Sequence, residues 1–278
     1  RGLGDVYKRQ AMTFPRIVAL DMDGTLVDPD GNIPEEFWSV LEDAKEKGMV
    51  IAPASGRQLA TLQDMFDGRG IETFIAENGG VVWHRGEVVS TKPMSEKAVD
   101  AVLRAAAESA APIHPVVCTP EFAFVAEDIP ETAAEETKKY YHSQRPVSSL
   151  LEAKKESTDP TIKVALYVET DAETDGLDVA EAARGQNIAI SGANWVDIMS
   201  PETNKGRALR ALADTHGIDI ADTAAIGDYL NDFEMLETAG TAVAMENGHE
   251  KLKAIADIIA ASNADHGAIT QIKEWLAQ

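Results

Sequence analysis

Short apolar runs alternate with amphipathic segments near the start of the chain. The apolar runs at residues 17–20, 49–52 and 71–76 have the length of buried strands. Between them, residues 33–48 and 55–66 carry apolar side chains at helical spacing. The order strand, helix, strand, helix, strand predicts a parallel sheet with helical crossover connections.

This alternation breaks down from about residue 81. Residues 81–89 have the pattern of a β-hairpin, and residues 144–159 are polar and poorly periodic, so no element is predicted there. The other expected elements are strands near 113–118, 122–126, 161–169, 188–190 and 195–198, and helices near 95–110, 131–142 and 172–184. We interpret residues 84–195 as an inserted α+β domain that caps the core.

The first alternation returns near residue 205. The expected elements are a helix opened by Lys205, a strand at 224–226, a helix at 228–238, a strand at 242–245, and helices near 249–255 and 269–276. The fold class is therefore α/β, with a Rossmann-like parallel-sheet core formed by residues 12–83 and 196–278. Residues 1–11 lack the apolar centre of a signal peptide and precede Met12, so we expect them to be a non-native extension.

Composition narrows the classes of function. The formal net charge of -22 argues against nucleic acid as a partner and disfavours anionic membranes. No apolar run is long enough to cross a bilayer. The single cysteine, Cys118, excludes an internal disulfide framework and a thiolate-rich zinc site, so a cytoplasmic location is expected. The expected assembly is a monomer or a homodimer.

Two carboxylates follow the first apolar run directly. In an extended strand, Asp21 and Asp23 lie on the same face, where they repel unless a cation joins them or one is protonated. On its own, such a pair is common in solvated turns. A calcium loop would need glutamate at its twelfth position, where this chain has Asn32. The carboxyl end of a buried strand is, by contrast, where ligands bind in open α/β sheets.

Three further segments place polar residues at strand ends or helix starts. They begin at Ser55, Lys205 and Asp228. Each has an alternative reading, since Ser55 could cap a helix, Lys205 could be solvated and Asp228 could cap the helix predicted after it. In that helix, Asp228 and Asp232 would lie one turn apart. The combination of all four segments in this order points to a single site.

Hydrolysis of a phosphate monoester gives each residue a role. Asp21 would attack phosphorus and form an aspartyl-phosphate, while Asp23 would act as acid and base. Mg²⁺ would be held by Asp21, Asp228 and the backbone carbonyl of Asp23, because attacking carboxylate and phosphate are both anionic. Ser55 and Lys205 would hold phosphoryl oxygens. Other residues expected to contact the phosphate are Met22, Gly24, Thr25, Gly56, Arg57 and Asn231, with Asp232 in support.

These segments resemble the haloacid dehalogenase-like (HAD) phosphatase superfamily, and the resemblance runs from Phe14 to Leu276. It is closest to the Cof-type group, subfamily IIB, because the insertion lies between Ser55 and Lys205. Further matching segments are 77–80, 203–206, 242–247 and 263–267. The resemblance implies a Rossmann-like core, a large α/β cap, Mg²⁺ dependence and the roles given above. It also implies that Asn78 contacts substrate and that Asn204 supports the site.

The expected function is thus a phosphatase for small phosphorylated metabolites, such as sugar phosphates or phosphorylated cofactors. A phosphomutase, which returns the phosphoryl group to substrate, is the nearest alternative. A catalytically silent, phosphate-sensing regulator is less favoured, because Asp23 and Lys205 are both present. The aromatic and histidine side chains that could line a pocket are expected to pack in the core instead, namely Trp83, His84, Phe122, Tyr140 and Trp195.

Overall fold

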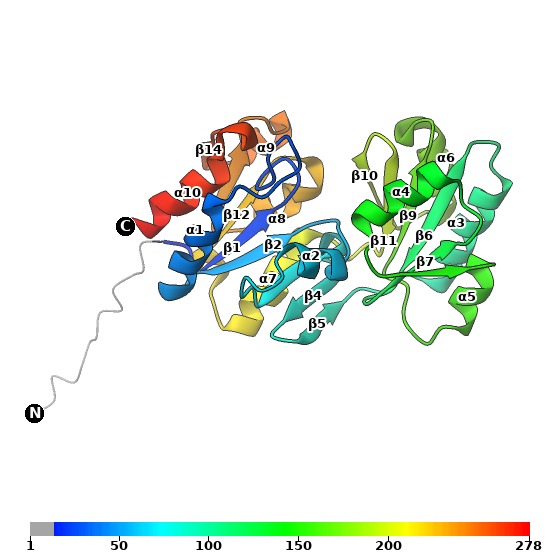
Figure 1. Cartoon of the computed structure of the whole chain (residues 1–278), viewed down its shortest axis with the longest axis horizontal. Helices are drawn as coiled ribbons and strands as arrows, with labels where there is room; N and C mark the ends of the chain where they lie inside the picture. Colours follow the sequence, from blue (N-terminus) through cyan, green and yellow to red (C-terminus); the bar gives the residue numbers. More distant parts are fainter. Residues whose placement is uncertain (1–13) are drawn as a thin grey trace, which may run out of the picture.

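The computed structural model describes residues 14–278 and contains two β-sheets, each covered by helices (Figure 1). The expected extension at residues 1–11 lies outside the described residues. The larger sheet and its helices form the left half of Figure 1, and the smaller sheet forms the right half. In the part of the chain that the structure describes, no helix is long and apolar enough to cross a membrane.

The larger sheet has the strand order β14-β13-β12-β1-β2-β3-β4-β5. Neighbouring strands from β14 to β3 run parallel, as expected, whereas β4 and β5 form an antiparallel hairpin at one edge. The strands are β1 (Ile17–Asp21), β2 (Val50–Ala54), β3 (Thr73–Ala76), β4 (Val81–His84), β5 (Glu87–Thr91), β12 (Thr223–Gly227), β13 (Thr241–Met245) and β14 (Ile258–Ala260). This arrangement places β1 at the centre of the sheet, and all five of its residues are buried.

Helices cover both faces of this sheet. On one face, α1 and α10 pack on the sheet through Phe37, Val40, Ile269 and Ile272. On the other face, α7 and α8 do so through Leu209, Leu212 and Met235. The helices of this half are α1 (Glu36–Glu46), α2 (Leu59–Met65), α7 (Lys205–His216), α8 (Phe233–Thr238), α9 (Glu250–Ile255) and α10 (Gly267–Leu276).

The smaller sheet has the order β10-β11-β9-β6-β7-β8. Its core packs side chains of β9 and β11, such as Leu166 and Ile198, against Val99 and Val102 of α3. Its strands are β6 (Ile113–Cys118), β7 (Ala123–Ala126), β8 (Gln144–Val147), β9 (Lys163–Val168), β10 (Asn187–Gly192) and β11 (Trp195–Met199). Its helices are α3 (Glu96–Glu108), α4 (Glu131–Tyr140), α5 (Leu150–Glu156) and α6 (Leu177–Ala180).

The structure fills in the segment that had no prediction. Residues 144–159 contain the edge strand β8 and the short helix α5. The strand has no apolar alternation because it pairs with β7 alone and both its central residues, Arg145 and Pro146, are exposed. The expected limits of the insertion, residues 84 and 195, fall inside strands of the larger and smaller sheet, respectively. We propose that the cap begins after β5 and ends after β11.

Candidate active site

The carboxyl ends of three neighbouring strands bring the predicted residues together. Asp21 is the last residue of β1, Ser55 follows β2 directly, and Asp228 follows β12 directly. Because β1 pairs in parallel with both β2 and β12, these three ends meet at one edge of the sheet. This edge is where ligands bind in α/β folds of this type.

Lys205 connects the fourth segment to the same point. It is the first residue of α7, and its ammonium donates hydrogen bonds to Asp21 Oδ1 (2.8 Å) and Asp232 Oδ1 (2.6 Å). The lysine side chain is completely buried, so it is not the solvated lysine of the alternative reading. Asn204 accepts a hydrogen bond from the Arg207 N–H and caps the helix that carries Lys205.

The turn after β1 holds the aspartates close together. The Thr25 hydroxyl lies 3.0 Å from Asp21 Oδ2 and 3.0 Å from Asp228 Oδ1. Gly24 has a φ of +79°, and a Cβ atom there would lie 2.2 Å from Asp228 Oδ2. A side chain at position 24 would therefore displace Asp228. Met22, by contrast, points its side chain into the core, so only its backbone could contact a phosphate.

The loop after β12 differs from the prediction. The expected helix at 228–238 begins only at Leu230, with a 3₁₀ turn that leads into α8. Asp232 Oδ2 accepts hydrogen bonds from the N–H groups of Asp228 (3.0 Å) and Tyr229 (3.2 Å), so Asp232 folds back over the loop. The predicted placement of Asp228 and Asp232 one helical turn apart is therefore wrong, because Asp228 lies before the helix.

Crowding of carboxylates in this buried place perturbs their titration. Burial, partly offset by Lys205, raises the pKa of Asp21 to about 7, and Asp228 adds to the increase. Burial, followed by repulsion from Asp21, raises the pKa of Asp232 to about 6. The pKa of Asp228 is also raised, mainly by burial. One lysine thus leaves negative charge in the cluster uncompensated.

The same aspartates fit a divalent cation. Asp21, Asp228 and Asp232 each offer a carboxylate oxygen, and these oxygens lie within 4.8 Å of one another. Hard divalent cations prefer oxygen ligands and would neutralise the excess charge. Asp232 already uses one oxygen for Lys205 and the other for two backbone N–H groups. The Thr25 hydroxyl has one hydrogen and can donate to only one of Asp21 and Asp228 at a time, so these two carboxylates are the better candidates for direct ligands.

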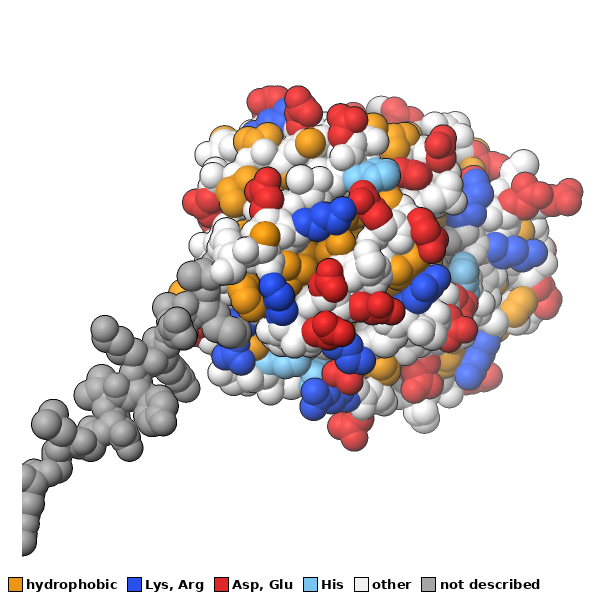
Figure 2. All heavy atoms as spheres, turned by 60° about the vertical axis from the view of Figure 1, so that its left-hand side comes forward, with side chains coloured by type: hydrophobic (Ala, Val, Ile, Leu, Met, Phe, Trp, Pro, Cys, Tyr) orange, Lys and Arg blue, Asp and Glu red, His pale blue; other side chains and the backbone are white. Residues whose placement is uncertain are grey.

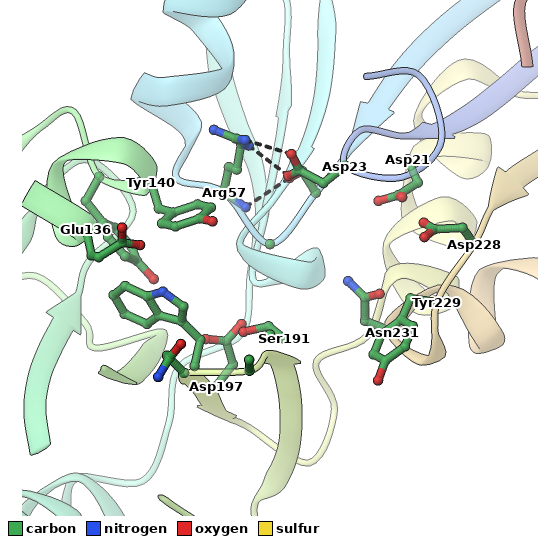
Figure 3. Close-up of a pocket in the computed structure, with 17 residues that line it drawn as sticks. Asp21, Asp23, Arg57, Glu136, Tyr140, Ser191, Asp197, Asp228, Tyr229 and Asn231 are labelled. Carbon is green, nitrogen blue, oxygen red and sulfur yellow. Dashed lines mark hydrogen bonds and ion pairs between the residues drawn. The ribbon is translucent and has the colours of Figure 1, made fainter. Parts of the chain in front are cut away.

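Asp23 faces a different partner from Asp21. Its carboxylate forms a bidentate ion pair with Arg57, with distances of 3.0 Å to Nε and 2.7 Å to Nη2 (Figure 3). Arg57 also donates to the Lys139 carbonyl of α4 and lies over the Tyr140 ring. Arg57, expected to contact phosphate, is thus held between the core turn and the cap.

Asn78 joins the remaining site residues. Its amide donates to Asp197 Oδ2 (2.9 Å) on the cap strand β11, and its carbonyl accepts from Asn231 Nδ2 (3.3 Å). A Cβ on Gly56 would lie 3.1 Å from the Asn78 side chain, so the Ser55 loop packs against it. The structure thus places Asn78 and Asn231 beside Ser55.

A cavity of about 430 Å³ opens over these residues between core and cap. The core contributes Asp21, Asp23, Ser55, Gly56, Arg57, Asp228 and Asn231 to its lining, among others (Figure 3). Asn204 does not line it. From the cap, Glu136, Tyr140, Trp195 and Asp197 face the same space.

Sequence reasoning missed these four cap residues as site residues. Tyr140 and Trp195 pack against each other and on the core cluster, as expected, but they also line the cavity. Trp83, Phe122 and His84 pack against other rings, as expected. Glu136 lies in a helix with several other glutamates, and nothing in that local pattern distinguishes it. These four residues can be identified only from the folded structure, which brings them close to the core segments of the site.

Comparison with known proteins agrees with this geometry. A family model described as haloacid dehalogenase-like hydrolase matches residues 18–272. The chain belongs to this family. The HMP-PP phosphatase of Cronobacter sakazakii is 28% identical over 86% of this chain and 87% of its own length. The 5-amino-6-(5-phospho-D-ribitylamino)uracil phosphatase YbjI of Escherichia coli K12 is 28% identical over 94% and 96%.

A solved structure shares the two-domain architecture. The HAD subclass IIB sugar phosphatase BT4131 superposes with a TM-score of 0.79 at 22% identity, covering 93% of this chain and 98% of the other. The expected haloacid dehalogenase-like family and the α/β fold with a second sheet are therefore confirmed. The chain is accordingly a hydrolase of the haloacid dehalogenase-like family.

As pH rises, the metal-free fold should lose stability, whereas the stabilisation of the fold by Mg²⁺ should increase. Folding raises the pKa values of Asp21 and Asp232, so the protonated carboxyls stabilise the metal-free fold below about pH 4, and this contribution is lost as pH rises through 6 to 7. Mg²⁺ needs the carboxylates ionised. We therefore expect Mg²⁺ to raise the melting temperature more at about pH 8 than at about pH 5.

Thermal unfolding with excess Mg²⁺ or with EDTA measures this difference. Asp228→Asn should lose most of the Mg²⁺ effect, whereas Asp30→Asn in the exposed turn after β1 should retain it. An equal Mg²⁺ effect at both pH values would contradict the assignment of these carboxylates to the cation site.

Proposed function

We propose that this enzyme hydrolyses phosphate monoesters of small metabolites through a phosphoaspartate on Asp21, with Mg²⁺ as cofactor. The observation that carries the proposal is the setting of Asp21. Its two oxygens are held by Lys205 and Thr25, beside Asp228, at the wall of a cavity that can receive a substrate. A nucleophilic carboxylate needs this combination of fixed orientation and nearby positive charge.

The ligands proposed for Mg²⁺ are Asp21, Asp228 and the backbone carbonyl of Asp23. When bound, the ion would supply positive charge between an attacking carboxylate and an anionic phosphate. Asp232 would act indirectly, because both its oxygens are engaged in fixing Lys205 and the loop that carries Asp228.

The reaction divides into two steps in which atoms and protons balance. An Asp21 oxygen attacks phosphorus, the bond from phosphorus to the ester oxygen breaks, and Asp23 gives its proton to the leaving oxygen. Asp23 then takes a proton from water, the water oxygen attacks phosphorus, and the bond to Asp21 breaks. Inorganic phosphate leaves and the Asp21 carboxylate is restored.

Other residues of the site would bind the phosphoryl oxygens. The Ser55 hydroxyl and Asn231 line the cavity, and Lys205, which does not line it, would donate the third hydrogen of its ammonium from behind Asp21. Arg57 fixes the orientation of the Asp23 carboxylate through the bidentate ion pair between them. These assignments follow the predicted roles, with Arg57 acting on Asp23 in place of phosphate.

Charge in the cap half of the cavity bears on the choice of substrate. Glu136 and Asp197 both line it, and Arg57 is the only cationic side chain in the described lining. Asp23 already pairs with that arginine, and Lys139, which pairs with Glu136, does not line the cavity. We therefore propose leaving groups without a second phosphate, such as a sugar or an uncharged ring.

Asp21→Asn tests the nucleophile. The amide cannot attack phosphorus, so we expect Mg²⁺-dependent cleavage of p-nitrophenyl phosphate to disappear while circular dichroism stays unchanged. Asp128→Asn on the exposed surface of the cap is the control and should be fully active. Turnover by Asp21→Asn at the level of the unmodified enzyme would reject the role of Asp21. Phosphate release without a phosphorylated activator also distinguishes a phosphatase from a phosphomutase.

Asp23→Asn tests the proton donor through the leaving group. Loss of general acid catalysis should reduce kcat by roughly 10²- to 10⁴-fold for glucose 6-phosphate, whose alkoxide needs a proton. The reduction should be smaller for p-nitrophenyl phosphate, because p-nitrophenolate is stable without one. Steady-state assays of phosphate release measure both. Equal reductions for the two esters would assign Asp23 another role.

Discrimination by charge is tested with two sugar phosphates. We expect kcat/KM to be at least about tenfold lower for fructose 1,6-bisphosphate than for glucose 6-phosphate, because the second phosphate would meet Glu136 and Asp197. Glu136→Gln should narrow this ratio, whereas Glu135→Gln, next to it on an exposed position of α4, should not. A preference for the bisphosphate would contradict the proposed substrate class.

A further inference from the structure

A second cluster of buried charges lies where core and cap meet. Its members are Glu77, from the turn after β3 in the core, and Lys163 and Asp197, from cap strands β9 and β11. The exposed fractions of these side chains are only 1%, 1% and 3%. We call this group the interdomain cluster. Buried charges are costly to desolvate, so their presence calls for an explanation beyond packing.

The carboxylates keep Lys163 charged. Burial alone would lower its pKa, but Asp197 and Glu77 outweigh that effect and raise it. The Lys163 ammonium is nevertheless farther from Glu77 Oε2, at 3.5 Å, than from the Gly56 carbonyl oxygen, to which it donates at 2.9 Å. Neither Glu77 oxygen has a hydrogen-bond partner among the described residues. The shortest contact of this lysine is thus with a backbone carbonyl of the Ser55 loop.

The contact of Lys163 with Gly56 is one of three hydrogen bonds to successive backbone carbonyls of the Ser55 loop. The carbonyls of Ser55, Gly56 and Arg57 each accept a hydrogen bond, at 2.9, 2.9 and 3.0 Å. The outer two accept from the backbone N–H groups of Asn78 and Glu77 in the core. The middle one accepts from Lys163, which belongs to the cap. The loop is therefore fixed from the core at both ends and from the cap at its centre.

The turn that supplies the outer two bonds is itself rigidly placed. Glu77 and Asn78 have φ values of 53° and 56°, which are uncommon for residues with side chains. Gly79 follows with a φ of 97°, and a Cβ there would lie 2.4 Å from the Asn204 carbonyl oxygen. Residues in such conformations persist only where surrounding contacts impose them, often at functional sites.

Fixing the Gly56 carbonyl also fixes the N–H on the other side of the same peptide unit. In a trans peptide, the carbonyl and the N–H point in opposite directions, and no cis peptide occurs in the described residues. The Arg57 N–H therefore points away from Lys163, and it donates to Ser55 Oγ at 3.0 Å. With its oxygen accepting this bond, the Ser55 hydroxyl keeps its own hydrogen for another acceptor.

We propose that Lys163 is a positioning residue for phosphoryl binding, which acts from the cap through the Gly56 carbonyl to aim the Ser55 hydroxyl. This inference rests on the proposed function, in which Ser55 binds the phosphoryl group. The phosphate-binding loop is complete only when the cap lies on the core. Asp197 contributes by holding Asn78, whose backbone fixes the neighbouring carbonyl.

The alternative role for Lys163 is to neutralise the buried carboxylates, and paired variants separate the two roles. Lys163→Met removes both the charge and the donor and leaves Glu77 and Asp197 without their cation. In Lys163→Met/Glu77→Gln the Glu77 charge is gone and Asp197 keeps its hydrogen bond from Asn78, so part of the lost stability should return. We expect the inhibition constant for inorganic phosphate, and KM for p-nitrophenyl phosphate, to stay at least about tenfold raised in the double variant.

Two single variants serve as controls. Glu77→Gln keeps Lys163 on the Gly56 carbonyl, so phosphate inhibition should stay within about twofold of the unmodified enzyme. Lys154→Met removes a largely buried cap lysine that pairs with Asp100 inside the cap at 2.6 Å, and it should not change phosphate inhibition either. Thermal unfolding of every variant reports stability separately.

The outcomes distinguish this proposal from the function on which it rests. If the double variant has the phosphate inhibition constant of the unmodified enzyme, Lys163 only balances charge and the proposal is wrong. If the double variant does not fold, the single variant Glu77→Gln still tests the proposal. A tenfold higher inhibition constant for phosphate in Glu77→Gln would overturn it. If the unmodified enzyme releases no phosphate from any ester, the proposed function itself fails.

Discussion

The buried contact of Lys205 with Asp21 and Asp232 is the interaction on which the site depends. It joins the end of β1, the start of α7 and the loop after β12, which are far apart in the sequence. A buried ammonium would be costly alone, and so would the carboxylates, so each fixes the position of the others. The strand and helix geometry of the core has to bring these three side chains within hydrogen-bond distance for any of them to be tolerated.

The cap is attached to the same site by polar contacts at several points. Arg57 reaches the Lys139 carbonyl, Asn78 reaches Asp197, and Lys163 reaches Gly56. Each contact joins a cap residue to a residue next to, or within, the Ser55 loop. Apolar cap side chains such as Tyr141 and Ile162 also pack in one cluster with the core, so the two halves meet through an interface that is both polar and apolar. The architecture therefore suits a cap whose position is coupled to the readiness of the site.

The core could be predicted from the sequence because its signals are local. A buried run such as 17–20, followed directly by Asp21, identifies both a strand and a ligand-facing end. The interdomain cluster has no such signal, since Lys163 lies at the start of an ordinary strand pattern and Asp197 alternates with apolar residues in β11. The helix after Asp228 begins two residues later than the pattern predicts, because Asp232 folds back and accepts hydrogen bonds from the N–H groups of the loop. Contacts between distant segments decide these features.

The charge of the protein constrains how an anionic substrate can bind. Acidic side chains are scattered over the face shown in Figure 2, and the formal net charge is -22, so long-range attraction does not favour a phosphate. Within the site, three aspartates and Lys205 sum to two negative charges when ionised, which one divalent cation cancels. Without a cation, the pKa of Asp21 is raised to about 7, so a large share of this carboxyl is protonated near neutral pH, and a protonated Asp21 is a poor nucleophile. Cation binding would therefore both admit the phosphate and keep the attacking carboxylate ionised.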